Sequence, residues 1–431
     1  YHTLGAGYYE QYRQDKLAKY GLPDIILASL NNGVLTPDTL KKTDLIRQRW
    51  LDNQFYGGVF SLKANPWKRL NLVFGGGWNH YQGKHFGEVI WAKYANALPN
   101  GYRYYENNAT KTDLNFYAKG SADLSTKFTL SADLQYRNVW YSFLGYNQML
   151  ENVQQSVSLA FFNPKLALNY ALGSKSRIFL SGSVGSREPV RDDYTQSTPT
   201  SRPLPEKLYD YELGFRRGGR KTELAATAFY MLYENQLVLT GAINDVGAYT
   251  RTNIPKSYRA GIELEASWMA LKSLKLSGNL ALSRNKIISS YTEYLFDYES
   301  ETEKSFIYSN SDLSFSPSVI ASAIASYSLS KYLELSLVGK YVGEQFLDNT
   351  SSDLRKIDPF MVCNFRIGLK PAPTLKPGMD FSLQINNLFN ARYSSNGYTY
   401  SDMYGMQRND YNYYFPQAGT HLLFMLRISI D

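Results

Sequence analysis

Residues 422–431 read Leu-Leu-Phe-Met-Leu-Arg-Ile-Ser-Ile-Asp. Large apolar side chains occupy every even position, whereas Arg427, Ser429 and Asp431 occupy odd ones. Successive side chains of a β-strand point to opposite sides, so this segment is predicted to be a strand with one apolar and one polar face. The same alternation marks 130–137 and 261–268. Apolar groups on one side and charges on the other are typical of a membrane barrel, with lipid outside and a wet lumen inside.

The composition favours a β-rich membrane protein. Aromatic residues make up 15% of the 431 residues, and the mean hydropathy is -0.38. No run approaches the roughly 18 apolar residues of a membrane-spanning helix, but a barrel strand needs an apolar residue only at every second position. The net charge is +8, yet no basic run or nucleic-acid motif appears, so nucleic acid is not an expected partner. A basic surface suits anionic lipopolysaccharide or an anionic substrate.

The chain is therefore predicted to be all-β, with residues 1–431 forming one transmembrane antiparallel barrel domain. Roughly sixteen segments have the length of a tilted membrane strand. Their approximate spans are 1–9, 46–64, 67–81, 112–122, 126–140, 155–171, 175–187, 206–217, 220–234, 254–268, 272–286, 316–328, 332–345, 358–369, 377–388 and 419–430.

Short and long connections between the predicted strands alternate along this chain. The short ones are predicted near 65–66, 123–125, 172–174, 217–219, 271, 329–330 and 371–373, and the stretches between them are long and polar. Outer-membrane barrels show this asymmetry, with short periplasmic turns and long extracellular loops. In the longest loop, 15–20 and 38–46 are compatible with short helical pieces.

Two histidines lie in a segment rich in aromatic residues. His80 and His85 are accompanied by Trp78, Tyr81 and Trp91, which makes contact with haem or a metal one hypothesis. The simpler interpretation is two solvated loop histidines, because no carboxylate or Cys partner stands at ligand spacing.

Charged residues form two further candidate sites. Arg187 and Arg191 lie near Glu188, Asp192 and Asp193 at the end of one strand. The arginines would clamp an anionic ligand, or the cluster would simply neutralise itself at the surface. A second cluster, Asp348, Asn349 and Asp353, would offer oxygen ligands to Ca²⁺, although such spacing is common in loops.

The last long loop is rich in tyrosine. Its candidates for stacking on a ligand are Tyr398, Tyr400, Tyr404 and Tyr411, with Tyr413 and Tyr414 beside them. No serine-hydrolase, zinc-protease or phosphate-loop motif appears. We therefore expect neither an enzyme nor a cofactor.

Several segments resemble TonB-dependent receptors of the siderophore and cobalamin type. Residues 385–390, Ile-Asn-Asn-Leu-Phe-Asn, followed by Tyr393, resemble the family's N-L-F-N-x-x-Y signature before the last strand. Asn253 with 257–265 resembles a family strand that begins N…G-V/I-E. Weaker similarities lie at 7–10, 186–189, 341–343 and 347–349.

The resemblance implies a barrel of about 22 strands around an N-terminal plug. Nothing plug-like is predicted here, and Asp431 stands where an aromatic residue is usual. We therefore expect the C-terminal part of such a barrel, without the plug, its TonB-contacting segment and about six leading strands. A complete, smaller barrel remains the alternative.

The resemblance also implies active import through the outer membrane of a Gram-negative bacterium. Extracellular loops would bind an iron-siderophore, haem or cobalamin-like complex, and TonB, ExbB and ExbD would supply energy through the plug. Two other hypotheses stay open from the sequence: a passive porin-like channel, and an adhesive barrel whose loops bind another protein.

Overall fold

A computed structural model describes residues 2–31, 34–94, 101–146, 150, 152–195, 197, 202–243, 249–369 and 378–429. Within these ranges the chain is almost entirely β-structure, with two short helical pieces, the 3-10 helix Leu17–Tyr20 and the α-helix α1, Arg191–Thr195. Neither of them is long or apolar enough to cross a membrane.

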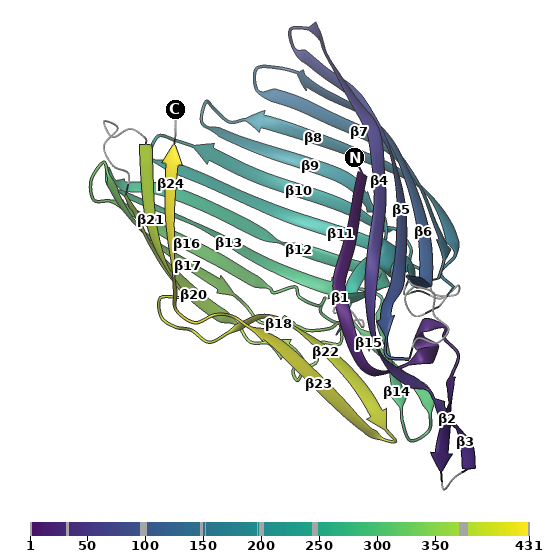
Figure 1. Cartoon of the computed structure of the whole chain (residues 1–431). Helices are drawn as coiled ribbons and strands as arrows, with labels where there is room; N and C mark the ends of the chain where they lie inside the picture. Colours follow the sequence, from purple (N-terminus) through teal and green to yellow (C-terminus); the bar gives the residue numbers. More distant parts are fainter. Residues whose placement is uncertain are drawn as a thin grey trace.

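One antiparallel sheet of sixteen strands forms the wall (Figure 1). In spatial order its strands are β1 (His2–Lys16), β4 (Lys42–Trp67), β5 (Leu70–Ala92), β6 (Tyr102–Asp123), β7 (Phe128–Gly145), β8 (Gln155–Ala171), β9 (Ser176–Arg187), β10 (Glu206–Gly218), β11 (Thr222–Ile243), β12 (Tyr249–Leu271), β13 (Leu274–Ile287), β16 (Val319–Ser328), β17 (Leu333–Val342), β20 (Phe360–Leu369), β21 (Gly378–Asn386) and β24 (His421–Ser429). The strands within the long connections form separate, smaller sheets. Each strand of the wall pairs with the wall strands that precede and follow it along the chain.

The sixteen predicted strands correspond one to one with these sixteen. The predicted spans of β1, β4, β5, β6, β7, β11 and β12 are too short, because these strands continue far past the roughly 9–11 residues that cross a bilayer. For example, β4 has 26 residues and β5 has 23. The structure therefore places much of the predicted loop 82–111 in a long hairpin that stands above the membrane belt.

The connections have the predicted asymmetry. Six described turns on one edge are short, and all the long connections gather on the opposite edge, which we call the mouth (Figure 1). The predicted turn at 371–373 lies outside the described residues. Leu17–Tyr20 is helical as predicted, but the helical piece predicted at 38–46 is wrong, since these residues belong mainly to β3 and β4.

The long connections contain strands that the sequence analysis did not predict. β14 (Ser290–Asp297), β15 (Thr302–Ser309), β22 (Ser394–Tyr404) and β23 (Gln407–Pro416) form a second, four-stranded sheet, which we call the mouth sheet. A hairpin of β2 (Ile25–Asn31) and β3 (Val34–Leu40) projects beside it, and β18 (Gln345–Phe346) pairs with β19 (Lys356–Ile357).

The apolar residues of the wall are on the outside. Phe116, Leu134 and Ile262 are about half exposed, and their strands put polar residues on the other face. Buried apolar clusters occur instead at the mouth, for example around Tyr20 and Leu45 and around Ile287 and Leu313. This inverted distribution fits a wall whose outer face is covered by lipid.

Candidate ligand-binding site

The aromatic and histidine residues predicted to lie in a loop are in strand β5. The pairing of β5 with β6 is regular from Leu70 to Gly87, so even and odd positions face opposite sides. Trp78 and His80 share one face, on which His80 Nδ1 is 2.8 Å from Thr112 Oγ1. Tyr81 and His85 share the other. Trp91, beyond the register shift at Gly87, is exposed.

The face that carries Tyr81 and His85 is the lumen side. The segment after β9 reaches back over β8 to this face: Glu188 Oε1 accepts bonds from Lys111 Nζ at 2.6 Å and Arg137 Nη2 at 3.0 Å. Arg137 Nε also binds Asp113 Oδ2, at 2.8 Å. Glu188, just after β9, thus contacts β7 and β6, which lie two and three strands away in the sheet. Such contacts require a curved sheet, and they lie on its concave side.

Arg191 is the centre of this lumenal region. Its Nη2 donates to Asn107 Oδ1 at 3.1 Å, while its Nε is buried without a described partner. The amide nitrogen of Asn107, a completely buried residue, also lacks one. Asn107 is the cross-strand partner of His85, and His85 Nε2 lies 3.3 Å from the Tyr81 hydroxyl. Lys111 pairs with Tyr81 on one side and with Tyr141 on the other, so Tyr141 shares this face. The structure thus gathers three of the predicted residues into one aromatic, cationic cluster, together with Tyr141, which spacing along the sequence did not reveal.

Arg187 lies elsewhere, at a cavity of about 420 Å³ under the segment 313–316. Its Nη2 is 3.1 Å from Glu206 Oε2, which also accepts the backbone N–H of Leu237 at 2.9 Å. Arg259 and Tyr233 line the same cavity. Arg187 and Arg191, which were predicted to form one site, therefore lie in two different places. Arg187 is held by the carboxylate of Glu206.

Five tyrosines of the last long connection share one face of the β22–β23 hairpin, whereas Tyr414 is on the other face, where its hydroxyl donates to the Lys356 carbonyl at 3.1 Å. Tyr398 and Tyr413 stack with ring centroids 4.8 Å apart and planes 9° apart, and Tyr400 stacks on Tyr411 at 4.9 Å. Tyr413 and Tyr400 continue the column at 5.9 Å. The stacked rings stiffen the hairpin, yet Tyr400, Tyr411 and Tyr413 remain exposed to solvent. Tyr404, near the hairpin tip, is exposed.

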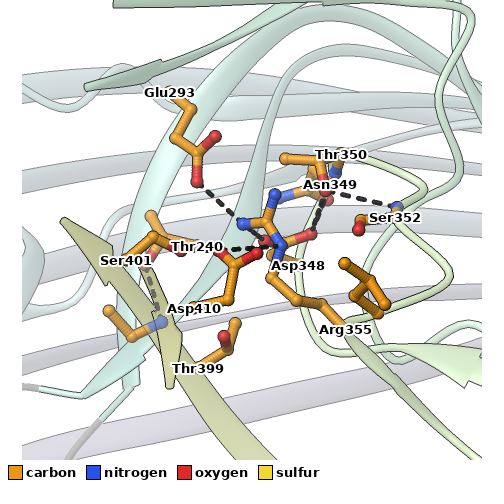
Figure 2. A network of polar contacts seen from close by, with 12 residues as sticks. Thr240, Glu293, Asp348, Asn349, Thr350, Ser352, Arg355, Thr399, Ser401 and Asp410 are labelled. Carbon is orange, nitrogen blue, oxygen red and sulfur yellow. Dashed lines mark hydrogen bonds and ion pairs between the residues drawn. The ribbon is translucent and has the colours of Figure 1, made fainter. Parts of the chain in front are cut away.

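The opposite face of this hairpin enters an ionic network (Figure 2). Arg355, only 3% exposed, binds Glu293 Oε1 at 2.8 Å and also pairs with Asp348. Arg408 Nη2 donates to Glu293 Oε1 at 2.8 Å, and its Nε to Asp410 Oδ1 at 2.8 Å. Two arginines and three carboxylates thereby join three long connections.

The three residues proposed for calcium are separated by their partners. Asp348 is engaged by Arg355 and Thr350, and Asn349 links the Ser314 N–H, at 3.0 Å, to the Leu239 carbonyl, at 2.7 Å. Asp353 is solvent-exposed and pairs with Lys356 at 3.0 Å. This geometry does not gather their oxygens around one point, and the described residues contain no cluster of three potential metal-ligating side chains.

The network should make the mouth sheet sensitive to acid. Burial acts to raise the pKa of Glu293, but Arg408 and Arg355 outweigh it and hold the pKa below its usual value. Lys304 chiefly lowers the pKa of Asp297 in the same sheet. A depressed folded-state pKa gives stability that is present above the ordinary carboxylate pKa and lost as the pH falls through the folded value. Burial raises the pKa of Asp348, so this residue opposes the trend.

We therefore expect the sheet to loosen below about pH 4. Spin labels at Glu301 and Met406, on its two hairpin tips, should give a narrow distance distribution from pH 5 to 8 and a broad one at pH 3. A distribution unchanged at pH 3 would contradict the expectation.

The fold and this lumen define a class, the antiparallel transmembrane β-barrels with an elaborated mouth. The chain belongs to the TonB dependent receptor-like β-barrel family, whose model matches residues 2–388.

Solved structures of similar fold include the copper transporter OprC, with a TM-score of 0.66 and 15% identity over 89% of this chain and 57% of that one. The ferric citrate transporter FecA has a TM-score of 0.62 and 15% identity over 89% of this chain and 55% of that one. The ferric yersiniabactin receptor FyuA of Yersinia pestis has a TM-score of 0.60 and 16% identity over 89% and 58%. This chain thus spans less than three fifths of each protein, and at these identities the likeness concerns the fold.

Proposed function

We propose that the chain forms the wall and mouth of an outer-membrane receptor that imports an iron-siderophore, haem or cobalamin-like complex into a Gram-negative bacterium. Membership of the family supports the class, and the similar proteins FecA and FyuA take up ferric citrate and ferric yersiniabactin. Energy would come from TonB, ExbB and ExbD through a plug, which the described residues do not include.

The observation that carries a ligand site is the cluster around Arg191. A guanidinium with a buried Nε free of described partners, on the same lumen face as Tyr81, His85 and Tyr141, suits an anionic ligand that bears rings. The charge would attract the anion, and the aromatic rings would pack against its flat groups.

The pairing of the strands supports a receptor over a self-contained pore. β1 and β24 stand at the two ends of the strand order, and each pairs with a single described strand. An open edge is costly in lipid, where every backbone polar group needs a partner. A self-contained pore would pair β1 with β24, and the described residues show no such pairing.

Replacing Arg191 with Gln should weaken binding of the transported chelate by roughly 10- to 100-fold, the range expected for a hydrogen bond to a charged group. Ferric catecholates, ferric hydroxamates, haem, cobalamin and a neutral oligosaccharide would be titrated against the purified protein by calorimetry. Lys84→Gln is the matched control, since Lys84 is exposed on the opposite face of β5. Equal affinity of both variants would remove Arg191 from the site. Binding of the oligosaccharide alone would overturn the proposed ligand class.

A further inference from the structure

The positive charge of this chain is concentrated on one edge of the wall. We define the short-turn rim as residues 67–70, 123–128, 171–177, 216–223, 271–275 and 328–334, the six described turns opposite the mouth. They contain twelve Lys and Arg residues and three carboxylates. The net positive charge of the rim exceeds the +8 of the whole chain, so the rest of the protein is close to neutral.

All twelve cations are exposed, and none forms an ion pair with a described carboxylate. They are Lys68, Arg69, Lys127, Lys175, Arg177, Arg216, Arg217, Arg220, Lys221, Lys272, Lys275 and Lys331. At the mouth, by contrast, several cations are held by carboxylates, namely Arg47, Lys111, Arg137, Arg355 and Arg408. The rim charges are therefore available to a partner.

The rim cations stand beside exposed apolar residues. Trp67 precedes Lys68, and four of the other five turns expose Leu124, Leu172, Leu271 and Leu329, all close to a Lys in the sequence. Lys331 Nζ lies 4.8 Å from the ring centroid of Tyr332. Large apolar side chains next to cations, at the point where a strand leaves the apolar belt, suit the boundary between acyl chains and headgroups.

We propose that the short-turn rim binds anionic phospholipid headgroups of the leaflet that faces the periplasm. Short turns face the periplasm in bacterial barrels. Every described turn around the rim contains at least one of these cations, as expected if a shell of lipid surrounds the rim. An acidic protein partner would need such cations in only one patch. The apolar residues insert beside the acyl chains while the cations hold the phosphates.

The test measures lipid selectivity of the purified, native-length protein. Spin-labelled phosphatidylglycerol and phosphatidylcholine are compared in phosphatidylcholine vesicles by the immobilised fraction of the electron-spin spectrum. We expect phosphatidylglycerol to be preferred several-fold, and less so at high salt because the charges are screened. The variant Lys68→Gln, Arg69→Gln, Arg220→Gln, Lys221→Gln removes four of the twelve rim cations and should lose about a third of that preference, since each cation near an anionic surface contributes to it.

Two variants serve as controls. Arg13→Gln, Lys41→Gln, Lys42→Gln, Lys256→Gln removes the same charge at the mouth and should keep the preference. Exchanging Lys for Arg and Arg for Lys at the four rim positions should keep it too and shows that the rim tolerates substitution. An unchanged preference in the neutralised rim variant overturns the proposal, as does an equal loss in the mouth variant. Loss of binding to an acidic periplasmic protein, with lipid selectivity intact, also overturns it.

Discussion

Replacing Arg355 with Met should release the mouth sheet from the wall. Arg355 and Asp348 are almost completely buried, and Glu293 is nearly so. Removing one partner of a buried ion pair leaves uncompensated charge, which typically costs about 3–5 kcal/mol. Arg408 still holds Glu293, but Asp348 loses its cation. We expect hydrogen exchange in β14, β22 and β23 to accelerate strongly, while the wall strands remain protected.

Lys356→Met is the matched control for this variant. Lys356 is adjacent in sequence and also pairs with two carboxylates, Glu344 and Asp353, but it is at the surface. Exposed pairs contribute little because water screens them, so exchange should barely change. Adding Asp348→Asn and Glu293→Gln to Arg355→Met should restore part of the protection, because the buried charges are gone. Equal exchange in Arg355→Met and in the unaltered protein would show that the network does not hold the sheet.

Replacing Asn387 with Ala should destabilise the last hairpin of the wall. Asn387 is 3% exposed, and its side chain donates to the carbonyls of Ala391 and Ala418 at 2.8 and 3.1 Å. Its oxygen accepts the Ala391 N–H at 2.8 Å. The residue has a φ of 49°, a left-handed conformation that Asn tolerates and Ala adopts at a cost of roughly 1–2 kcal/mol. Leaving buried groups without partners costs about 1–3 kcal/mol more.

The measurement is guanidinium unfolding of the protein in lipid vesicles, with Asn390→Ala as control. Asn390 has a φ of 53° but is exposed, and its oxygen accepts the Thr420 N–H at 3.2 Å. Both variants carry the backbone cost, so their difference isolates the buried hydrogen bonds of Asn387. We expect the midpoint to fall clearly more for Asn387→Ala. Equal shifts would mean that the signature acts through backbone conformation alone.

The signature around Asn387 was recognised in the sequence, and the structure supplies its physical reason. Asn387 joins the end of β21 to the residues just before β24, and Tyr393 stacks on Phe360 with ring centroids 4.4 Å apart. The motif anchors both ends of the long connection that carries the tyrosine column. Its role in this chain is therefore structural.

The predicted site residues do not all lie on the same side of the wall, and the reason is geometric. Tyr81, His85 and Arg191 lie on the lumen side, whereas Trp78 and His80 face the other side of β5. Strict alternation would have separated them, had β5 been predicted to extend past residue 81. Pairing of β22 with β23 stacks four of the tyrosines on one another, and their stacking on a ligand stays a prediction.

The sequence alone determined the sixteen wall strands, their order and the positions of the described short turns. Alternation is a local property, because each residue's side follows from its neighbours in the same strand, and antiparallel strands joined by tight turns must lie side by side. Only the tertiary structure decided the mouth sheet and its ionic network. Glu293 and Arg408 are 115 residues apart, and their meeting depends on how long connections from different strands pack together once the wall has curved.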